Sequence, residues 1–223
     1  MSEPGAPPVI ENPILNGPFS EPTRHFRVDD LGITPEVEES RRVSSYFMPI
    51  AQPRRMGKQL RLETEWTRDR LKENKRVNRI RQRVGQWRQG GYVGVTQTTA
   101  RLLEYWTNPG REKKLFFCQI EAVETAIYIT EVAKKYGDAW IDNELREEND
   151  PYNRGLPRLA LKMATGSGKT VVMAMLIAWQ ALNKQEHRQD ARFSDAFLLV
   201  TPAYRYTSRR WPTLTTTTVT MPS

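Results

Sequence analysis

The sequence predicts an α/β fold built on a parallel sheet. Residues 159–161 are a short apolar stretch typical of a buried strand, and residues 171–179 are an unbroken apolar run long enough for a core helix. A glycine-rich turn lies between them, and a second buried-strand pattern covers residues 196–200. Strand, helix and strand in this order predict a βαβ unit with parallel strands and a right-handed crossover.

The turn before the helix reads MATGSGKT over residues 163–170. Gly166 and Gly168 let successive N–H groups and the helix N-terminus point at one spot, which makes an anion site. Lys169 is expected to reach the β- and γ-phosphates of a nucleotide, and the Thr170 hydroxyl to hold Mg²⁺. A chance glycine turn is the alternative, and the flanking strand and helix patterns argue against it. The predicted nucleotide-binding residues of this loop are Thr165, Gly166, Ser167, Gly168, Lys169 and Thr170.

This loop resembles motif I of superfamily 2 DEAD/DEAH-box helicases and translocases, especially the Res-type subunit of type III restriction enzymes. The likeness extends from ENPILNGPFSEPTRHF near the N-terminus to Thr201 and Pro202. It implies part of a RecA-like ATP-binding domain, ATP and Mg²⁺ as cofactors, and double-stranded DNA as a partner. It further implies a methyltransferase (modification) subunit as a second partner, and a DNA-backbone contact by Thr201, which corresponds to motif Ia.

A glutamine precedes the loop in the stretch LFFCQIEA, residues 115–122, which is similar to the Q-type motif of the same family. Its carboxamide offers a donor and an acceptor side by side, as adenine N6 and N7 require. The resemblance therefore makes Gln119 the adenine reader, with Phe116 or Phe117 packing near the base. A glutamine at a helix start is also common without any ligand. A helix is expected over residues 115–135, because apolar residues recur on one face.

Two further helices are expected in the region before this one. A long amphipathic helix is predicted over residues 62–89, ended by Gly90 and Gly91, and another over residues 96–106. Residues 1–55 hold many prolines and read as an extended arm, and residues 137–155 read as an acidic and polar surface loop. The expected divisions are the arm at 1–55, a basic helical region at 56–112, the partial ATP-binding domain at 113–202 and a Thr-rich tail at 203–223.

Charge is unevenly distributed along the chain. Residues 1–40 contain eight acidic and two basic side chains, whereas residues 54–88 contain thirteen basic and four acidic ones, a net +9 against +8 for the whole chain. Such density suits a polyphosphate partner, with Trp66 and Trp87 available for stacking. The alternative is a solvated helix face, with the helically spaced Val77, Ile80, Val84 and Trp87 buried and the arginines outside whether or not DNA is bound. The predicted DNA-contacting residues are Arg76, Arg79, Arg83 and Thr201.

Composition excludes several other functions. The chain has 223 residues with one cysteine and two histidines, too few for a disulfide framework, a zinc site or a histidine-based triad. Cys118 is expected to be a small buried apolar side chain beside Phe116 and Phe117. The longest apolar run is far shorter than the roughly 20 residues that span a bilayer, so a cytoplasmic protein is expected.

The family pattern stops after Pro202. The tail contains seven threonines and no acid, and it reads as a truncated or out-of-frame end. Beyond Lys169 the only acids are Glu186, Asp190 and Asp195, none of which ends an apolar run as a Mg²⁺-binding Asp would. A second motor domain is also missing, so we expect an ATP-binding part of a helicase that is catalytically incomplete. The alternative is a non-enzymatic DNA-binding or interaction module using residues 54–88, and a P-loop kinase is disfavoured because its acids are equally absent.

Overall fold

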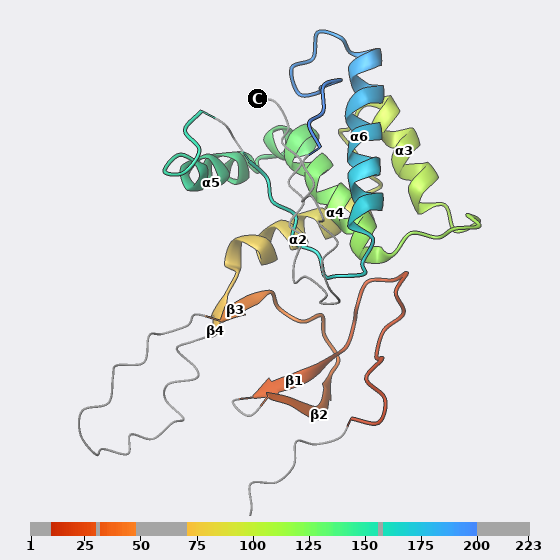
Figure 1. Cartoon of the computed structure of the whole chain (residues 1–223), viewed down its shortest axis with the longest axis vertical. Helices are drawn as coiled ribbons and strands as arrows, with labels where there is room; N and C mark the ends of the chain where they lie inside the picture. The colour runs from red at the N-terminus through yellow and green to blue at the C-terminus, as the bar shows by residue number, and fades with distance from the viewer. Residues whose placement is uncertain (1–9, 30–31, 48–70, 156–157, 200–223) are drawn as a thin grey trace, which may run out of the picture. The chain divides into compact units, whose positions relative to one another are not determined.

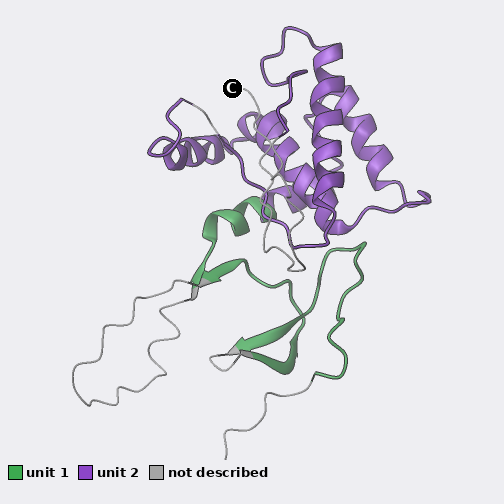
Figure 2. Ribbon diagram, in the orientation of Figure 1, with its two compact units in different colours: residues 1–81 green, residues 82–223 purple. Residues whose placement is uncertain are grey.

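The computed structural model describes residues 10–29, 32–47, 71–155 and 158–199. The chain divides into two compact units, residues 1–81 and 82–223 (Figure 2). Helix α2, Lys75–Gln89, crosses the boundary between them. The candidate nucleotide-binding residues all belong to the second unit.

The first unit contains short antiparallel strand pairs. Strand β1, His25–Asp29, pairs with β2, Gly32–Glu38, and β3, Ser45–Phe47, pairs with β4, Leu71–Glu73. Asn78 fastens the start of β3 to α2, because its Oδ1 accepts from Ser44 N at 2.9 Å and its Nδ2 donates to Ser44 O at 3.1 Å. Within the predicted arm, β1 and β2 form a hairpin, and the extent of the arm over 1–55 stays a prediction.

Helix α2 begins later than predicted. Residues 62–70 lie outside the described residues, and residues 71–73 form a strand instead of helix because their main chain pairs with β3. The helix ends at Gln89 before the predicted glycines, and Gly91 has φ +78°. Ile80, Val84 and Trp87 are buried as predicted, whereas Val77 is 41% exposed, so its predicted burial is wrong.

The second unit is helical over its described residues. The N-cap Thr96 of α3 accepts a 3.1 Å hydrogen bond from Thr99 N, which confirms the predicted helix start. The helix predicted over 115–135 is confirmed as α4 followed by a π-helical and a 3₁₀ turn, ended by Gly137 at φ +83°. No described helix combines the length and the apolar content that crossing a bilayer requires. The elements are α3 (Gln97–Thr107), α4 (Phe117–Ile127), η1 (Tyr128–Val132), η2 (Ala133–Tyr136), α5 (Ala139–Asn149) and α6 (Lys169–Glu186).

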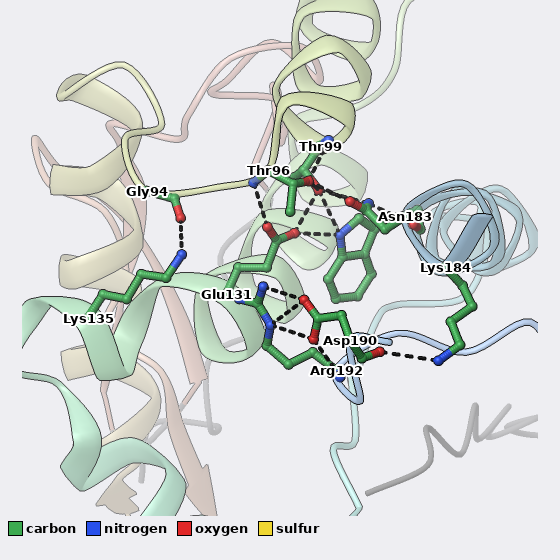
Figure 3. Close-up of polar contacts among 10 residues, drawn as sticks. Gly94, Thr96, Thr99, Glu131, Lys135, Asn183, Lys184, Asp190 and Arg192 are labelled. Atoms are coloured by element: carbon green, nitrogen blue, oxygen red, sulfur yellow. Dashed lines mark hydrogen bonds and ion pairs between the residues drawn. The ribbon is translucent and has the colours of Figure 1, made fainter. Parts of the chain in front are cut away.

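Helix α6 packs against α3 and α4 (Figure 1). A buried polar cluster joins α3, η1 and α6 (Figure 3): Glu131, 2% exposed, accepts from Thr99 Oγ1 at 2.7 Å and Trp179 Nε1 at 2.8 Å through Oε1. Its Oε2 accepts from Thr96 N at 2.8 Å, and Asn183 Nδ2 donates to Thr99 Oγ1 at 2.9 Å. Each buried polar atom of the Glu131 carboxylate is thus satisfied, and α3, η1 and α6 are held in one arrangement.

The predicted parallel sheet is not formed by the described residues. Residues 159–161 and 196–199 have no strand conformation, and the strands that the structure describes are antiparallel and lie in the first unit. An apolar stretch becomes a strand only when a neighbour accepts and donates its main-chain hydrogen bonds. Neither stretch has such a neighbour among the described residues, and Leu198 is 77% exposed.

The prediction of a loop over 137–155 is wrong for residues 139–149. Helix α5 occupies this part of the chain, and Ile141 is its fully buried anchor. The many acidic residues led to the prediction of a loop, although Ile141 and Leu145 are four residues apart, as on one face of a helix. Residues 150–155 form turns, as expected.

Candidate functional site

The glycine-rich loop leads directly into α6. Gly166 and Gly168 both have φ +79°, in the left-handed region that side-chain-bearing residues rarely adopt. The main-chain N–H groups of Gly168, Lys169 and Thr170 have no acceptor among the described residues. Adjacent N–H groups without an acceptor in the described part of the chain, at the positive end of an 18-residue helix, are the kind of group that favours an anion. The predicted role of the loop therefore agrees with its backbone geometry.

Lys169 is turned back onto its own loop. Its Nζ donates to the main-chain oxygen of Ala164 at 2.9 Å, and the same oxygen accepts from Ser167 Oγ at 2.6 Å. A phosphate bound at the loop would compete with Ala164 for the ammonium group, and a charge-assisted hydrogen bond to phosphate is the stronger of the two. Moving the ammonium group to a phosphate would break its hydrogen bond to Ala164.

Gln119 joins α4 to the loop. Its Oε1 accepts from Phe116 N at 3.0 Å, which caps the helix start, and its Nε2 donates to the main-chain oxygen of Ser167 at 3.0 Å. A carboxamide has two N–H donors and two oxygen lone pairs. One donor and one lone pair therefore remain, which is the pair that adenine requires.

The same glutamine explains why residue 168 is glycine. A Cβ built on Gly168 would lie 2.1 Å from Gln119 Nε2, well inside van der Waals contact, whereas a Cβ on Gly166 would meet nothing within 4 Å. The second glycine of the loop therefore serves both a left-handed turn and the close approach of Gln119. The spacing of the motif predicted the turn but not this contact.

An ion pair contacts α4 at Glu124, seven residues beyond the start of the helix. Arg88, in the last turn of α2, contacts Glu124 of α4 with Nη2 at 2.6 Å from Oε2 and Nε at 3.1 Å from Oε1. The hydroxyl of Tyr92 donates to Glu124 Oε1 at 2.6 Å, and burial, followed by the Glu124 charge, raises the pKa of this phenol. The Glu124 side chain is 0% exposed. The arrangement satisfies a buried carboxylate with three hydrogen-bond donors.

The prediction that the arginines of α2 lie on its outer face is wrong for Arg88. Its position is four residues after the fully buried Val84, on the inner face of the helix. The four-residue spacing from Val84 could have predicted that Arg88 lies on the inner face, but its positive charge favoured the prediction of an outer position. The guanidinium also stacks over the Phe117 ring, with Cζ 4.9 Å from the ring centroid.

The other predicted DNA-contacting residues are described in part. Arg76 and Arg79 lie on α2, where Arg79 is exposed and Arg76 is half-buried. The half-exposed Arg83 is held by the buried Asp138, with Nε 3.1 Å from Oδ1. Thr201 lies outside the described residues. Arg83 thus has a structural partner that the sequence did not reveal.

Thr170 is exposed on the first turn of α6, where its hydroxyl could be one ligand of a Mg²⁺ ion carried by the nucleotide phosphates. Within the described ranges, no three His, Cys, Asp or Glu side chains gather as a metal site. Asp190 is engaged by Arg192 at 2.6 Å, and this hydrogen bond lowers the pKa of Asp190 to about 2. Glu186 and Asp195 are exposed.

Cys118 is exposed, so its predicted burial is wrong. It precedes the buried Gln119 by one residue, about 100° around α4, and so faces away from the core that Gln119 and Val123 enter. Partial burial still raises the pKa of its thiol. The cysteine therefore lies at the surface beside the candidate adenine reader.

One cavity of about 230 Å³ lies elsewhere in the second unit. No residue of the glycine-rich loop lines it, so we do not assign the nucleotide to it. Its lining residues are Arg83, Gln86, Trp87, Gly90, Val93, Tyr128, Val132, Tyr136 and Asp138.

Residues 112–205 match the family model described as type III restriction enzyme, res subunit. The match covers less than half of the 223 residues and includes Gln119 and the glycine-rich loop. It confirms the family resemblance for this segment and implies a RecA-like fold for it. The ENPILNGPFSEPTRHF stretch lies outside the match, so the likeness there stays a prediction. No curated protein and no solved structure matches the chain.

Proposed function

We propose that this chain, whose residues 112–205 carry the res-subunit family segment, is the ATP-binding part of a DNA helicase or translocase. The observation that carries the proposal is a set of three N–H groups, at Gly168, Lys169 and Thr170, that have no acceptor in the described structure and lie at the start of α6 beside Gln119. Such an arrangement binds the phosphates of a nucleotide. The family resemblance supports ATP as the nucleotide.

Each site residue has a separate task in this proposal. The loop backbone from Thr165 to Thr170 binds phosphate oxygens, and the ammonium of Lys169 leaves Ala164 to neutralise the β- and γ-phosphates. Gln119 reads the adenine edge with its remaining donor and lone pair. The Thr170 hydroxyl would hold Mg²⁺, which when bound neutralises phosphate charge.

DNA is the second proposed ligand. Arg76, Arg79 and Arg83 would contact backbone phosphates, and Thr201 would do so by its resemblance to motif Ia. Phosphate contacts by arginine are independent of base sequence and weaken with salt, because they release counterions. A methyltransferase subunit is the further partner that the family resemblance supports.

Calorimetry with ATP and Mg²⁺ tests the nucleotide site. We expect weak binding that Lys169→Ala abolishes, because the ammonium is the main charge that faces the phosphates. Thr213→Ala, in the tail beyond the family match, is the control and should leave the affinity unchanged. Failure of the wild-type chain to bind ATP would contradict the proposal.

The alternative function is a DNA-binding module without nucleotide chemistry, and the density of basic residues at 54–88 favours it. A salt titration of DNA binding separates the two. The double substitution Arg76→Glu and Arg79→Glu should weaken binding to any sequence and reduce the salt slope by about 2. ATP binding lost in Lys169→Ala with DNA binding intact supports the motor assignment, whereas DNA binding without any ATP binding supports the module. Binding to one DNA sequence that persists at high salt contradicts both.

A further inference from the structure

Arg88 contacts helix α4 at two points. Its Nη2 lies 2.6 Å from Oε2 of the fully buried Glu124, and its Cζ lies 4.9 Å from the centroid of the Phe117 ring. Residues 117 and 124 are seven positions apart, two helical turns along the same face. One guanidinium therefore contacts α4 at its first residue and again two turns further along the same face.

The contact at Phe117 lies beside the adenine reader. Phe117 is the first residue of α4, and Gln119 follows two positions later with its carboxamide engaged by Phe116 N and Ser167 O. The hydrogen bond to Ser167 O requires α4 to hold one rotation relative to the loop, whereas the one from Phe116 N fixes the side chain at the helix start. A guanidinium suits this task because its planar fork binds a carboxylate with two nitrogens while its face stacks on a ring.

We infer that Arg88 is a positioning residue for adenine recognition: it holds the Phe117 ring and the Gln119 carboxamide where they meet the base. The inference rests on the proposed ATP-binding function and adds to it a determinant of base specificity outside the family match, which begins at residue 112. Arg88 makes no hydrogen bond to the glycine-rich loop in the described structure. Substitution of Arg88 should therefore weaken binding of the base and leave binding of the phosphates unchanged.

The test compares three ligands in the presence of Mg²⁺: ATP, GTP and inorganic tripolyphosphate. Tripolyphosphate engages the loop alone, so its affinity reports whether the loop is still folded. Arg88→Lys keeps the charge for Glu124 but loses the fork and the stacking. We expect ATP affinity to fall about fivefold, the preference for ATP over GTP to disappear, and tripolyphosphate affinity to stay at the wild-type value.

The chain offers a matched control in Arg192. This residue also binds a carboxylate with two nitrogens, Nη2 being 2.6 Å from Asp190 Oδ2, and its Cζ lies 5.3 Å from the Phe193 ring centroid. Arg192→Lys therefore removes the same kind of contact away from the candidate site. Its affinities for all three ligands should equal those of the wild type.

A second variant, Phe117→Leu, keeps the Arg88 and Glu124 pair and removes only the ring. It should lose the same ATP preference, and the double variant should be no worse than Arg88→Lys alone, since the lysine has already lost the contact with the Phe117 ring. An unchanged ATP to GTP ratio in Arg88→Lys overturns the inference, while loss of ATP binding in Lys169→Ala would leave the proposed function standing. An equal loss of ATP and tripolyphosphate affinity shows a purely structural role and also overturns it. A wild-type chain that binds neither ATP nor tripolyphosphate overturns both this inference and the proposed function.

Discussion

Gln119 donates a 3.0 Å hydrogen bond from Nε2 to the main-chain oxygen of Ser167, 48 residues further along the chain. The bond ties the start of α4 to the loop that begins α6. The Gly168 backbone approaches the same amide so closely that a Cβ would lie 2.1 Å from it. In the proposed function, recognition of the base and binding of the phosphates are thus linked through one carboxamide.

This contact predicts unequal effects at the two loop glycines. Gly166→Ala should lower the free energy of unfolding by about 1–2 kcal/mol, the cost of a left-handed alanine. Gly168→Ala has the same φ and adds a collision with Gln119, so it should cost about 1–3 kcal/mol more. Urea unfolding measures both, and the difference should vanish in a Gln119→Ala background. Equal losses of unfolding free energy for the two variants in the wild-type background would show that the Gln119 side chain moves aside without cost.

The polar cluster around Glu131 predicts a large effect of a small change. Glu131→Gln puts an amide N–H₂ opposite groups that already donate, among them Trp179 Nε1 and Thr99 Oγ1. We expect a loss of about 1–3 kcal/mol in unfolding free energy, because a buried donor is left unsatisfied. Glu104→Gln, on the exposed side of α3, is the matched control and should change it by less than about 0.5 kcal/mol. Similar values for the two variants would contradict the role assigned to the cluster.

Cys118 predicts a footprint of the nucleotide. It is the only cysteine of the chain, it is exposed, and burial raises the pKa of its thiol. Alkylation should therefore be slow at neutral pH and rise about tenfold per pH unit, because the thiolate reacts. Bound ATP should slow it further, since the proposed adenine position is beside Gln119. Protection that persists in Lys169→Ala would show that the footprint has another cause.

The ion pair of Asp190 and Arg192 predicts a stability change in acid. The hydrogen bond from Arg192 lowers the pKa of Asp190 from 3.8 to about 2, so its stabilising effect is present above pH 3.8 and is lost as the pH falls through about 2. Asp190→Asn should cost about 1 kcal/mol at pH 5 and almost nothing at pH 2. Urea unfolding across this range measures the convergence, with the exposed Asp195→Asn as control. A gap that stays constant with pH would contradict the assignment.

ATP turnover by this 223-residue chain is expected to be absent. Phosphoryl transfer needs an acid that helps to hold Mg²⁺ and a residue that orients water, and no loop hydrogen bond in the described structure involves an Asp or Glu. Phosphate release with and without DNA measures this. DNA-stimulated turnover that Lys169→Ala removes would contradict the expectation.

Local patterns alone determined the elements that carry the candidate site. The left-handed loop glycines, α6 behind them and the helix that begins near Gln119 were all predictable, because glycine spacing and helical periodicity act over a few residues. The same patterns failed where a partner decides the outcome: residues 159–161 look like a strand, but a strand exists only with a hydrogen-bonded neighbour.

Tertiary structure alone decided which side chains meet at the site. Arg88 and Glu124 are 36 residues apart, and Gln119 and Ser167 are 48 apart. No periodicity links such positions, so a charge like Arg88 was predicted to lie in solvent. Arg88 is instead buried in part, because the fold brings it against the fully buried carboxylate of Glu124, and a buried carboxylate is stabilised by a paired cation.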